Sequence, residues 1–143
     1  DASRAGVKIQ LLIRGICSLI PGVKGMSENI EAISIVDNYL EHSRVYIFGN
    51  EENPEVFISS ADFMTRNLDA RVEVTCPIYD EDIKNELINT FNIGWKGNVK
   101  ARVISEKLDN KYRIRGNSPV FRAQFETYNY YSNQIEVIDE EGV

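Results

Sequence analysis

This chain is poor in the residue types that build disulfide frameworks, metal centres and membrane spans. Its 143 residues include two cysteines and one histidine. Cys17 and Cys76 lie far apart in the sequence, and their spacing matches neither a zinc site nor a disulfide framework. We therefore expect both to be reduced thiols in a cytosolic protein. No window approaches about 18 consecutive apolar residues, so no transmembrane segment is predicted. No basic region followed by an apolar stretch opens the chain, so no secretory signal is predicted.

An excess of positive charge is also missing. The 16 lysines and arginines face 22 aspartates and glutamates, which gives a net charge of −6. Such a surface argues against non-specific binding of nucleic acid, so we expect no nucleic-acid partner. It still allows a local basic pocket for a phosphate ligand. The apolar fraction of 43% is enough for the core of one domain of ordinary size.

Short β-like segments alternate with helical ones, which is typical of an α/β protein. Residues 1–6 read like the end of a helix closed by Gly6, so we expect the chain to be a fragment of a larger protein. Residues 138–143 form an acidic tail that we expect to be frayed. Strands are predicted at 7–13, 30–36, 44–48, 55–59, 71–78 and 99–104, a polar hairpin connection at 49–54, a loop or single helical turn at 60–69, and helices at 80–95 and 120–134.

His42 is the first candidate for chemistry, because imidazole is the one side chain whose ordinary pKa lies near neutral pH. It precedes a predicted strand, and alternation along a strand would place His42 and Arg44 on the same face. A proton donor beside a fixed positive charge suits phosphoryl transfer. The alternative is a histidine at the surface or at a strand edge.

Three other segments carry polar groups that could converge on a phosphate. Arg14 ends the first predicted strand, and a guanidinium offers a planar fork that matches phosphate oxygens. The run Ser59-Ser60-Ala61-Asp62 offers hydroxyl and backbone donors just past a strand. The run from Arg66 to Glu73 is rich in charge. The alternatives are a surface ion pair, an ordinary turn and a solvated charged turn, respectively.

The order of these segments resembles a half-site of the phospholipase D superfamily. The pattern there is H-x-K, then G-S-x-N, then an acidic residue on a strand. Here Arg44 replaces the lysine, Ser59 the glycine and Asp62 the asparagine. Gly49 stands where the family places the aspartate that orients its nucleophilic histidine.

Longer runs resemble the C-terminal part of bacterial polyphosphate kinase of the type-1 family. The resemblance covers nearly the whole chain apart from the acidic tail. Its runs are Leu12–Cys17, Pro21-Gly22, Ser27–Ile30, Ser34–Val36, Tyr39–Arg44, Ser59–Asp69, Asn98–Arg102 and Arg115–Asn117.

This resemblance implies a fold and a role. The fold would be α/β, a phospholipase D-like mixed β-sheet flanked by helices, with residues 1–137 forming the C-terminal phospholipase D-like domain of a larger chain. The family reversibly transfers the terminal phosphate of ATP to polyphosphate through a phosphohistidine in a preceding domain. Arg14 and His42 match its nucleotide-contacting arginine and histidine, and His42 would be the catalytic residue of this chain. Arg71, and less closely Arg66, match basic residues that face the phosphates.

The resemblance also implies cofactors and partners. Mg²⁺ would be bound mainly by the preceding domain, so no metal ligand is assigned in this chain. The partners would be ATP or ADP, polyphosphate, the preceding domains and further copies in a homo-oligomer. The location would be the cytoplasm or the inner face of the membrane, and the isolated fragment would be inactive. Two alternatives stay open: a phospholipase D-type phosphodiesterase or nuclease half-site, and a non-catalytic phosphate-binding module.

Overall fold

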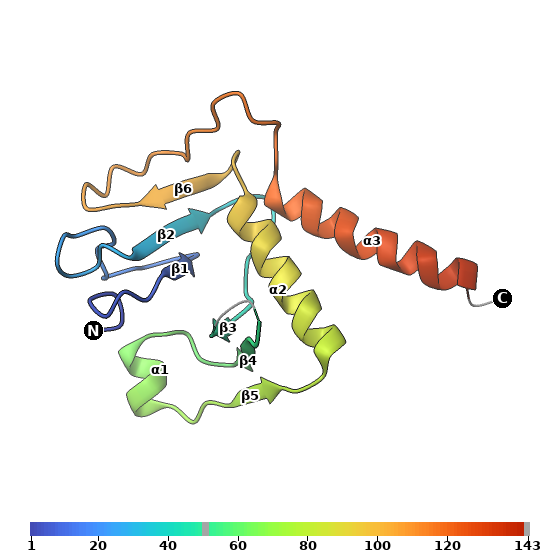
Figure 1. The fold of residues 1–143 in the computed structure, drawn as a ribbon, viewed down its shortest axis with the longest axis horizontal. Coiled ribbons are helices and arrows are strands. Elements are labelled where there is room, and N and C mark those ends of the chain that lie inside the picture. The colour runs from blue at the N-terminus through green and yellow to red at the C-terminus, as the bar shows by residue number, and fades with distance from the viewer. Residues whose placement is uncertain (50–51, 142–143) are drawn as a thin grey trace. The chain divides into compact units, whose positions relative to one another are not determined.

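The computed structural model describes residues 1–49 and 52–141, with side chains through residue 135. The chain divides into two compact units, one formed by Asp1–Glu41 and Ile93–Val143 and the other by His42–Asn92. Figure 1 shows the helices and strands of both. Asn50 and Glu51 of the predicted hairpin connection, and residues 142–143 of the predicted tail, lie outside the described residues.

A three-stranded mixed sheet forms the centre of the first unit, in the order β1-β2-β6. β1 pairs parallel with β2, and β6 pairs antiparallel with β2. Ala32 and Ile33 of β2 point to opposite faces and are only 3% and 2% exposed, so both faces of this strand are covered. The consecutive apolar residues of β2 fit such a doubly buried strand. The strands are β1 (Ile9–Leu12), β2 (Ile30–Ile35) and β6 (Ala101–Ile104).

Helix ends pack closely on this sheet at two glycines. A Cβ added at Gly94 would lie 3.0 Å from Leu12 Cδ1, and one at Gly97 would lie 3.2 Å from Ala123 Cβ. The absence of a side chain therefore lets the last turn of α2 (Glu81–Lys96) approach β1. Helix α3 (Ala123–Glu141) starts beside Gly97.

The second unit contains an antiparallel sheet in the order β3-β4-β5. Val56 in the central strand is 1% exposed and anchors this small core. Aromatic rings gather on the side of the sheet that carries Tyr46, whose ring contacts those of Phe48 and Phe63. The elements are β3 (Val45–Phe48), β4 (Glu55–Ser59), α1 (Thr65–Ala70) and β5 (Thr75–Ile78), followed by the first part of α2.

The start of α2 has a clear local cause. Asp80 Oδ1 accepts hydrogen bonds from the backbone N–H groups of Asp82 at 3.0 Å and Ile83 at 3.1 Å, as an N-cap residue does. Glu81 and Asp82 add negative charge where the helix dipole favours it. The capping carboxylate and the apolar spacing together explain why this helix could be predicted from sequence.

The predicted α/β class is confirmed, although the strands divide between two small sheets. The first and fifth strands are shorter than predicted, at Ile9–Leu12 and Thr75–Ile78. The last helix begins at Ala123 rather than Val120, and its backbone continues to Glu141 instead of ending at Gln134. Within the described residues, no helix combines the length and the apolar character needed to cross a bilayer.

Candidate functional site

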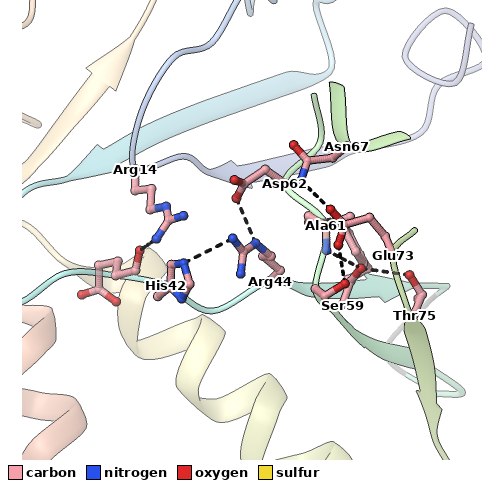
Figure 2. Close-up of polar contacts among 12 residues, drawn as sticks. Arg14, His42, Arg44, Ser59, Ala61, Asp62, Asn67, Glu73 and Thr75 are labelled. Atoms are coloured by element: carbon pink, nitrogen blue, oxygen red, sulfur yellow. Dashed lines mark hydrogen bonds and ion pairs between the residues drawn. The ribbon is translucent and has the colours of Figure 1, made fainter. Parts of the chain in front are cut away.

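His42, Arg44 and Asp62 form a connected polar group in the second unit. Arg44 Nη2 lies 3.2 Å from His42 Nε2, and Arg44 Nε donates to Asp62 Oδ1 at 2.9 Å (Figure 2). His42 and Arg44 immediately precede β3, and Asp62 follows β4. The predicted proximity of His42 and Arg44 is therefore observed, although the strand itself begins only at Val45.

The loop that carries Asp62 is fixed by serine hydroxyls. Ser59 Oγ accepts from the backbone N–H of Ala61 at 3.1 Å and lies 2.9 Å from Thr75 Oγ1 on β5. Ser60 Oγ accepts from Val74 N at 3.0 Å and donates to the Glu73 carboxylate. Both hydroxyls thus hold the loop against β5, whereas the sequence suggested that they would be donors for an oxyanion.

Glu73 joins this loop to helix α1. Asn67, which is 3% exposed, donates from Nδ2 to Glu73 Oε1 at 2.7 Å. The hydrogen bonds from Ser60 and then Asn67 hold the pKa of the Glu73 carboxyl below its ordinary value. Asp62 in turn raises the pKa of Arg44 through their hydrogen bond. Both groups are therefore charged at neutral pH, and each has a partner of matching chemistry.

Arg66 and Arg71 both lie in the segment that connects β4 to β5. Arg66 is in α1, Arg71 directly follows that helix, and both residues are exposed. The charge of Arg71 contributes to the lowered pKa of Glu73. The structure thus places these two arginines with His42, Arg44 and Asp62 in the second unit.

Arg14 belongs to the first unit, where it follows β1. Its Nη1 donates to the backbone carbonyl oxygen of Glu41 at 2.7 Å. Glu41 Oε1 also accepts from Gln124 Nε2 at 2.7 Å, and Gln124 exchanges two hydrogen bonds with the backbone of Tyr39, at 3.0 and 2.8 Å. The segment just before His42 is therefore held by Arg14 and by the start of α3.

An ion pair fixes the beginning of the same segment. Arg122 Nε donates to Asp37 Oδ2 at 2.8 Å, and Arg122 Nη2 donates to Asp37 Oδ1 at 2.6 Å. The Asp37 side chain is 2% exposed. The hydrogen bond from Arg122 lowers the pKa of Asp37. Burial of the carboxyl acts in the opposite direction, but the net shift is downward. This pair is a structural anchor that links positions 37 and 122.

Sequence reasoning missed the contacts of Asp37, Asn67 and Gln124. A buried asparagine inside a short helix is an unusual choice, because its amide competes with the helix backbone, so Asn67 was a usable signal. No local pattern marks Asp37 and Gln124, whose partners lie some 85 positions away in the sequence.

In the part of the chain that the structure describes, no three His, Cys, Asp or Glu side chains gather as metal ligands would. The donor set of the candidate site, which consists of arginines, a histidine and two paired carboxylates, suits phosphate oxygens better than a cation. The carboxylates of this site are already paired, Asp62 with Arg44 and Glu73 with Ser60 and Asn67.

Comparison with known proteins gives a consistent result. Residues 1–124 match the model of the family described as polyphosphate kinase C-terminal domain 2. The chain is 53% identical over 132 residues to the polyphosphate kinase of Vibrio cholerae, and 51% identical over 129 residues to that of Escherichia coli strain K12. These alignments cover 92% and 90% of the chain but 19% of each relative.

A solved structure is similar as well. The crystal structure of polyphosphate kinase from Porphyromonas gingivalis superposes with a TM-score of 0.91 at 43% sequence identity. The match covers 95% of this chain and 21% of that protein. The chain therefore spans about a fifth of the length of the proteins it matches.

Proposed function

Since this chain belongs to the polyphosphate kinase C-terminal domain 2 family, we propose that it is the last domain of a polyphosphate kinase. The whole enzyme would reversibly transfer the terminal phosphate of ATP to a polyphosphate chain. The observation that carries the proposal from the structure is the contact between His42 and the paired guanidinium of Arg44. Transfer of a phosphoryl group between polyanions needs fixed cations and hydrogen-bond donors at the transferred group, and this cluster supplies both.

The arginines would share the work of binding phosphate. Arg14 and His42 would contact the nucleotide phosphates, and Arg71 and Arg66 would add positive charge along the polyphosphate. An arginine stays protonated at any physiological pH, so its charge is always available to a phosphate. His42 adds an imidazole beside these fixed charges, in contact with Arg44.

Other parts of the reaction would lie outside this domain. The phosphohistidine and the residues that bind Mg²⁺ would belong to a preceding domain. The 143-residue chain by itself would therefore be inactive. From the family resemblance we also propose a homo-oligomer that resides in the cytoplasm or on the inner face of the membrane.

A phospholipase D-type phosphodiesterase is the second candidate. That chemistry uses a histidine oriented by an aspartate, and Phe48 and Gly49 stand where the aspartate would be expected. Within its unit, the described partner of the His42 ring is a guanidinium rather than a carboxylate. The geometry therefore favours a kinase over a phosphodiesterase. A phosphate-binding module without catalysis is the third candidate, and it would describe the chain taken alone.

The first test is phosphate transfer by the longer enzyme that contains this chain. Transfer of labelled terminal phosphate from Mg·ATP into acid-insoluble polyphosphate is compared between wild type and His42→Ala. We expect synthesis by the wild type and a loss of about 100-fold or more in the variant, the size reported for removal of one donor from a charge-stabilising site.

Arg14→Ala provides a second variant, with Arg4→Ala as its matched control. Arg4 is an exposed arginine of the same unit whose partner is Asp1. Arg14→Ala should lower synthesis, and Arg4→Ala should not. Wild-type cleavage of phosphodiesters without polyphosphate synthesis would replace the kinase with the phosphodiesterase. Equal synthesis by wild type and His42→Ala would remove His42 from the transfer site.

A further inference from the structure

In the hydrogen bond between Arg44 and His42, the chemistry of the two side chains determines which nitrogen is the donor. Arg44 Nη2 and His42 Nε2 are 3.2 Å apart. A guanidinium carries five N–H donors and no acceptor, and it does not lose its charge in proteins. In this contact Arg44 must donate, so His42 Nε2 must accept with a free lone pair.

An accepting Nε2 fixes the state of the whole ring. A neutral imidazole carries one proton, and when Nε2 is unprotonated that proton is on Nδ1. An imidazolium would place an N–H opposite the N–H of Arg44. The contact therefore selects the neutral ring with the proton on Nδ1.

Arg44 is itself held in place. Its Nε donates to Asp62 Oδ1 at 2.9 Å, and the side chains of Arg44 and Asp62 are 19% and 26% exposed. Asp62 follows Ala61, which is 4% exposed and whose backbone N–H donates to Ser59 Oγ. The guanidinium thus has a fixed anchor on one edge and presents another N–H to His42 (Figure 2).

We propose that Arg44, anchored by Asp62, is a positioning residue that keeps His42 in the Nδ1–H form, so that His42 offers a phosphate one N–H donor and no nucleophilic nitrogen. Among the described residues of its unit, His42 makes no other hydrogen bond, which leaves Nδ1–H for a ligand. The identity of the ligand as a phosphate rests on the proposed function, but the form of the ring does not.

This assignment separates the two candidate activities chemically. A phosphodiesterase that forms a phosphohistidine needs an imidazole lone pair that can attack phosphorus. In the Nδ1–H form, the one lone pair of the His42 ring nitrogens is already accepting from Arg44. A kinase whose phosphohistidine lies elsewhere needs from His42 only a donor to a phosphate oxygen, which Nδ1–H supplies.

The single histidine of this chain makes a direct test feasible. In the longer enzyme, only this chain is labelled with ¹⁵N-histidine by segmental ligation, and magic-angle-spinning NMR then reports one imidazole. Spectra are recorded at alkaline pH, where neutral rings dominate. We expect a protonated Nδ1 and an unprotonated Nε2 in the wild type. Arg44→Ala should shift the ring toward the Nε2–H form, which unconstrained imidazoles favour.

Two further variants guard against misfolding as an explanation. Arg44→Lys keeps an N–H donor and should retain mostly the Nδ1–H form, and Lys84→Ala removes a cation of the same unit that pairs with Glu81 and should change nothing. A protonated Nε2 in the wild type, or identical spectra for wild type and Arg44→Ala, would overturn the proposal. The NMR signature is read without turnover, so a failure of polyphosphate synthesis in the same samples would count against the proposed function alone.

Discussion

The arginine–aspartate pairs Arg122–Asp37 and Arg44–Asp62 differ in their surroundings and in what else each guanidinium contacts. In the pair Arg122–Asp37, two guanidinium nitrogens bind two oxygens of a carboxylate that is 2% exposed. In the pair Arg44–Asp62, one nitrogen binds one oxygen of a carboxylate that is 26% exposed, and another nitrogen faces His42. The guanidinium of Arg122 uses both of these nitrogens to hold the segments around positions 37 and 122 together. The guanidinium of Arg44 has a further nitrogen that faces the ring of His42.

Both arginines carry the same charge, so the different effects that we expect from their removal depend on the groups that each one contacts. Arg122 also donates to Asn38 at 3.1 Å and stacks on the ring of Phe125, so these contacts join residues of the first unit to one another. Arg44 connects a loop of the second unit to the histidine in front of β3. We therefore expect substitutions in the pair Arg122–Asp37 to lower the free energy of unfolding, and substitutions in the pair Arg44–Asp62 to lower the activity of the longer enzyme.

Removal of Arg44 should give the largest effect. In the longer enzyme we expect Arg44→Ala to lower polyphosphate synthesis about 100-fold, because His42 loses the group that sets its ring form. The melting temperature should fall only modestly, because the two side chains are 19% and 26% exposed and solvent screens part of the attraction between them. Steady-state synthesis and the melting temperature are measured on the same samples. A variant that keeps full activity, or that loses it only by unfolding, would break the comparison.

Removal of Asp37 should have the opposite pattern. Asp37→Ala leaves the guanidinium of Arg122 without its carboxylate, and we expect a loss of about 2 kcal/mol in the free energy of unfolding. Glu28→Ala, which removes an exposed carboxylate of the same unit, is the matched control. Denaturant unfolding measures both. Equal stabilities of Asp37→Ala and Glu28→Ala would show that the buried pair is not an anchor.

The pH dependence of the free energy of unfolding tests whether Asp37 stabilises the fold through its charge. The pKa of Asp37 is lowered in the folded chain by Arg122. Its contribution is therefore fully present above the unfolded pKa of about 3.9 and is lost as the pH falls through the lower folded pKa. Asp37→Asn should be less stable at neutral pH and should lose less stability on acidification than wild type. Glu73, whose pKa is also lowered, remains in both proteins as a common background. Parallel curves for the two proteins would contradict the assignment.

A third pair should give the smallest effect. Lys111 Nζ and Asp109 Oδ2 are 2.7 Å apart, closer than Arg44 and Asp62, but the lysine side chain is 75% exposed. Because water screens such a pair, we expect no measurable change in the melting temperature of Asp109→Asn. Differential scanning calorimetry in low and high salt checks this. A drop comparable to that of Asp37→Ala would mean that short distance, rather than burial, decides the strength of these pairs.

The parts of the fold that could be predicted from sequence are those with local causes. The hairpin of β3 and β4 follows from alternation, and α2 follows from its spacing and the Asp80 cap. These signals need only a few neighbouring residues. His42 and Arg44 lie in contact, but both precede β3, so the strand alternation used to predict their common face does not apply to them.

The remaining features depend on partners distant in sequence. Nothing near Asp37 indicates Arg122, and nothing in the strand patterns indicates that β2 pairs with β6 while β4 pairs with β5. The serine hydroxyls of the run from Ser59 to Asp62 were expected to face a ligand. They form hydrogen bonds with Thr75 of β5 and with Val74 just before it instead, partners that lie some 14 to 16 positions away in the sequence.

The segment that connects β4 to β5 is a loop whose two ends are hydrogen-bonded to each other. Ser60 N donates to Val74 O and Val74 N donates to Ser60 Oγ, each at 3.0 Å, so the two ends of residues 60–74 are tied together. A loop with fixed ends can change length at its tip at small entropic expense. Within this loop Asn67 is 3% exposed and donates to Glu73, so a change of length that keeps this contact must lie outside the segment from Asn67 to Glu73. A graft placed there would alter the reach of Arg66 while the sheet beneath is left intact.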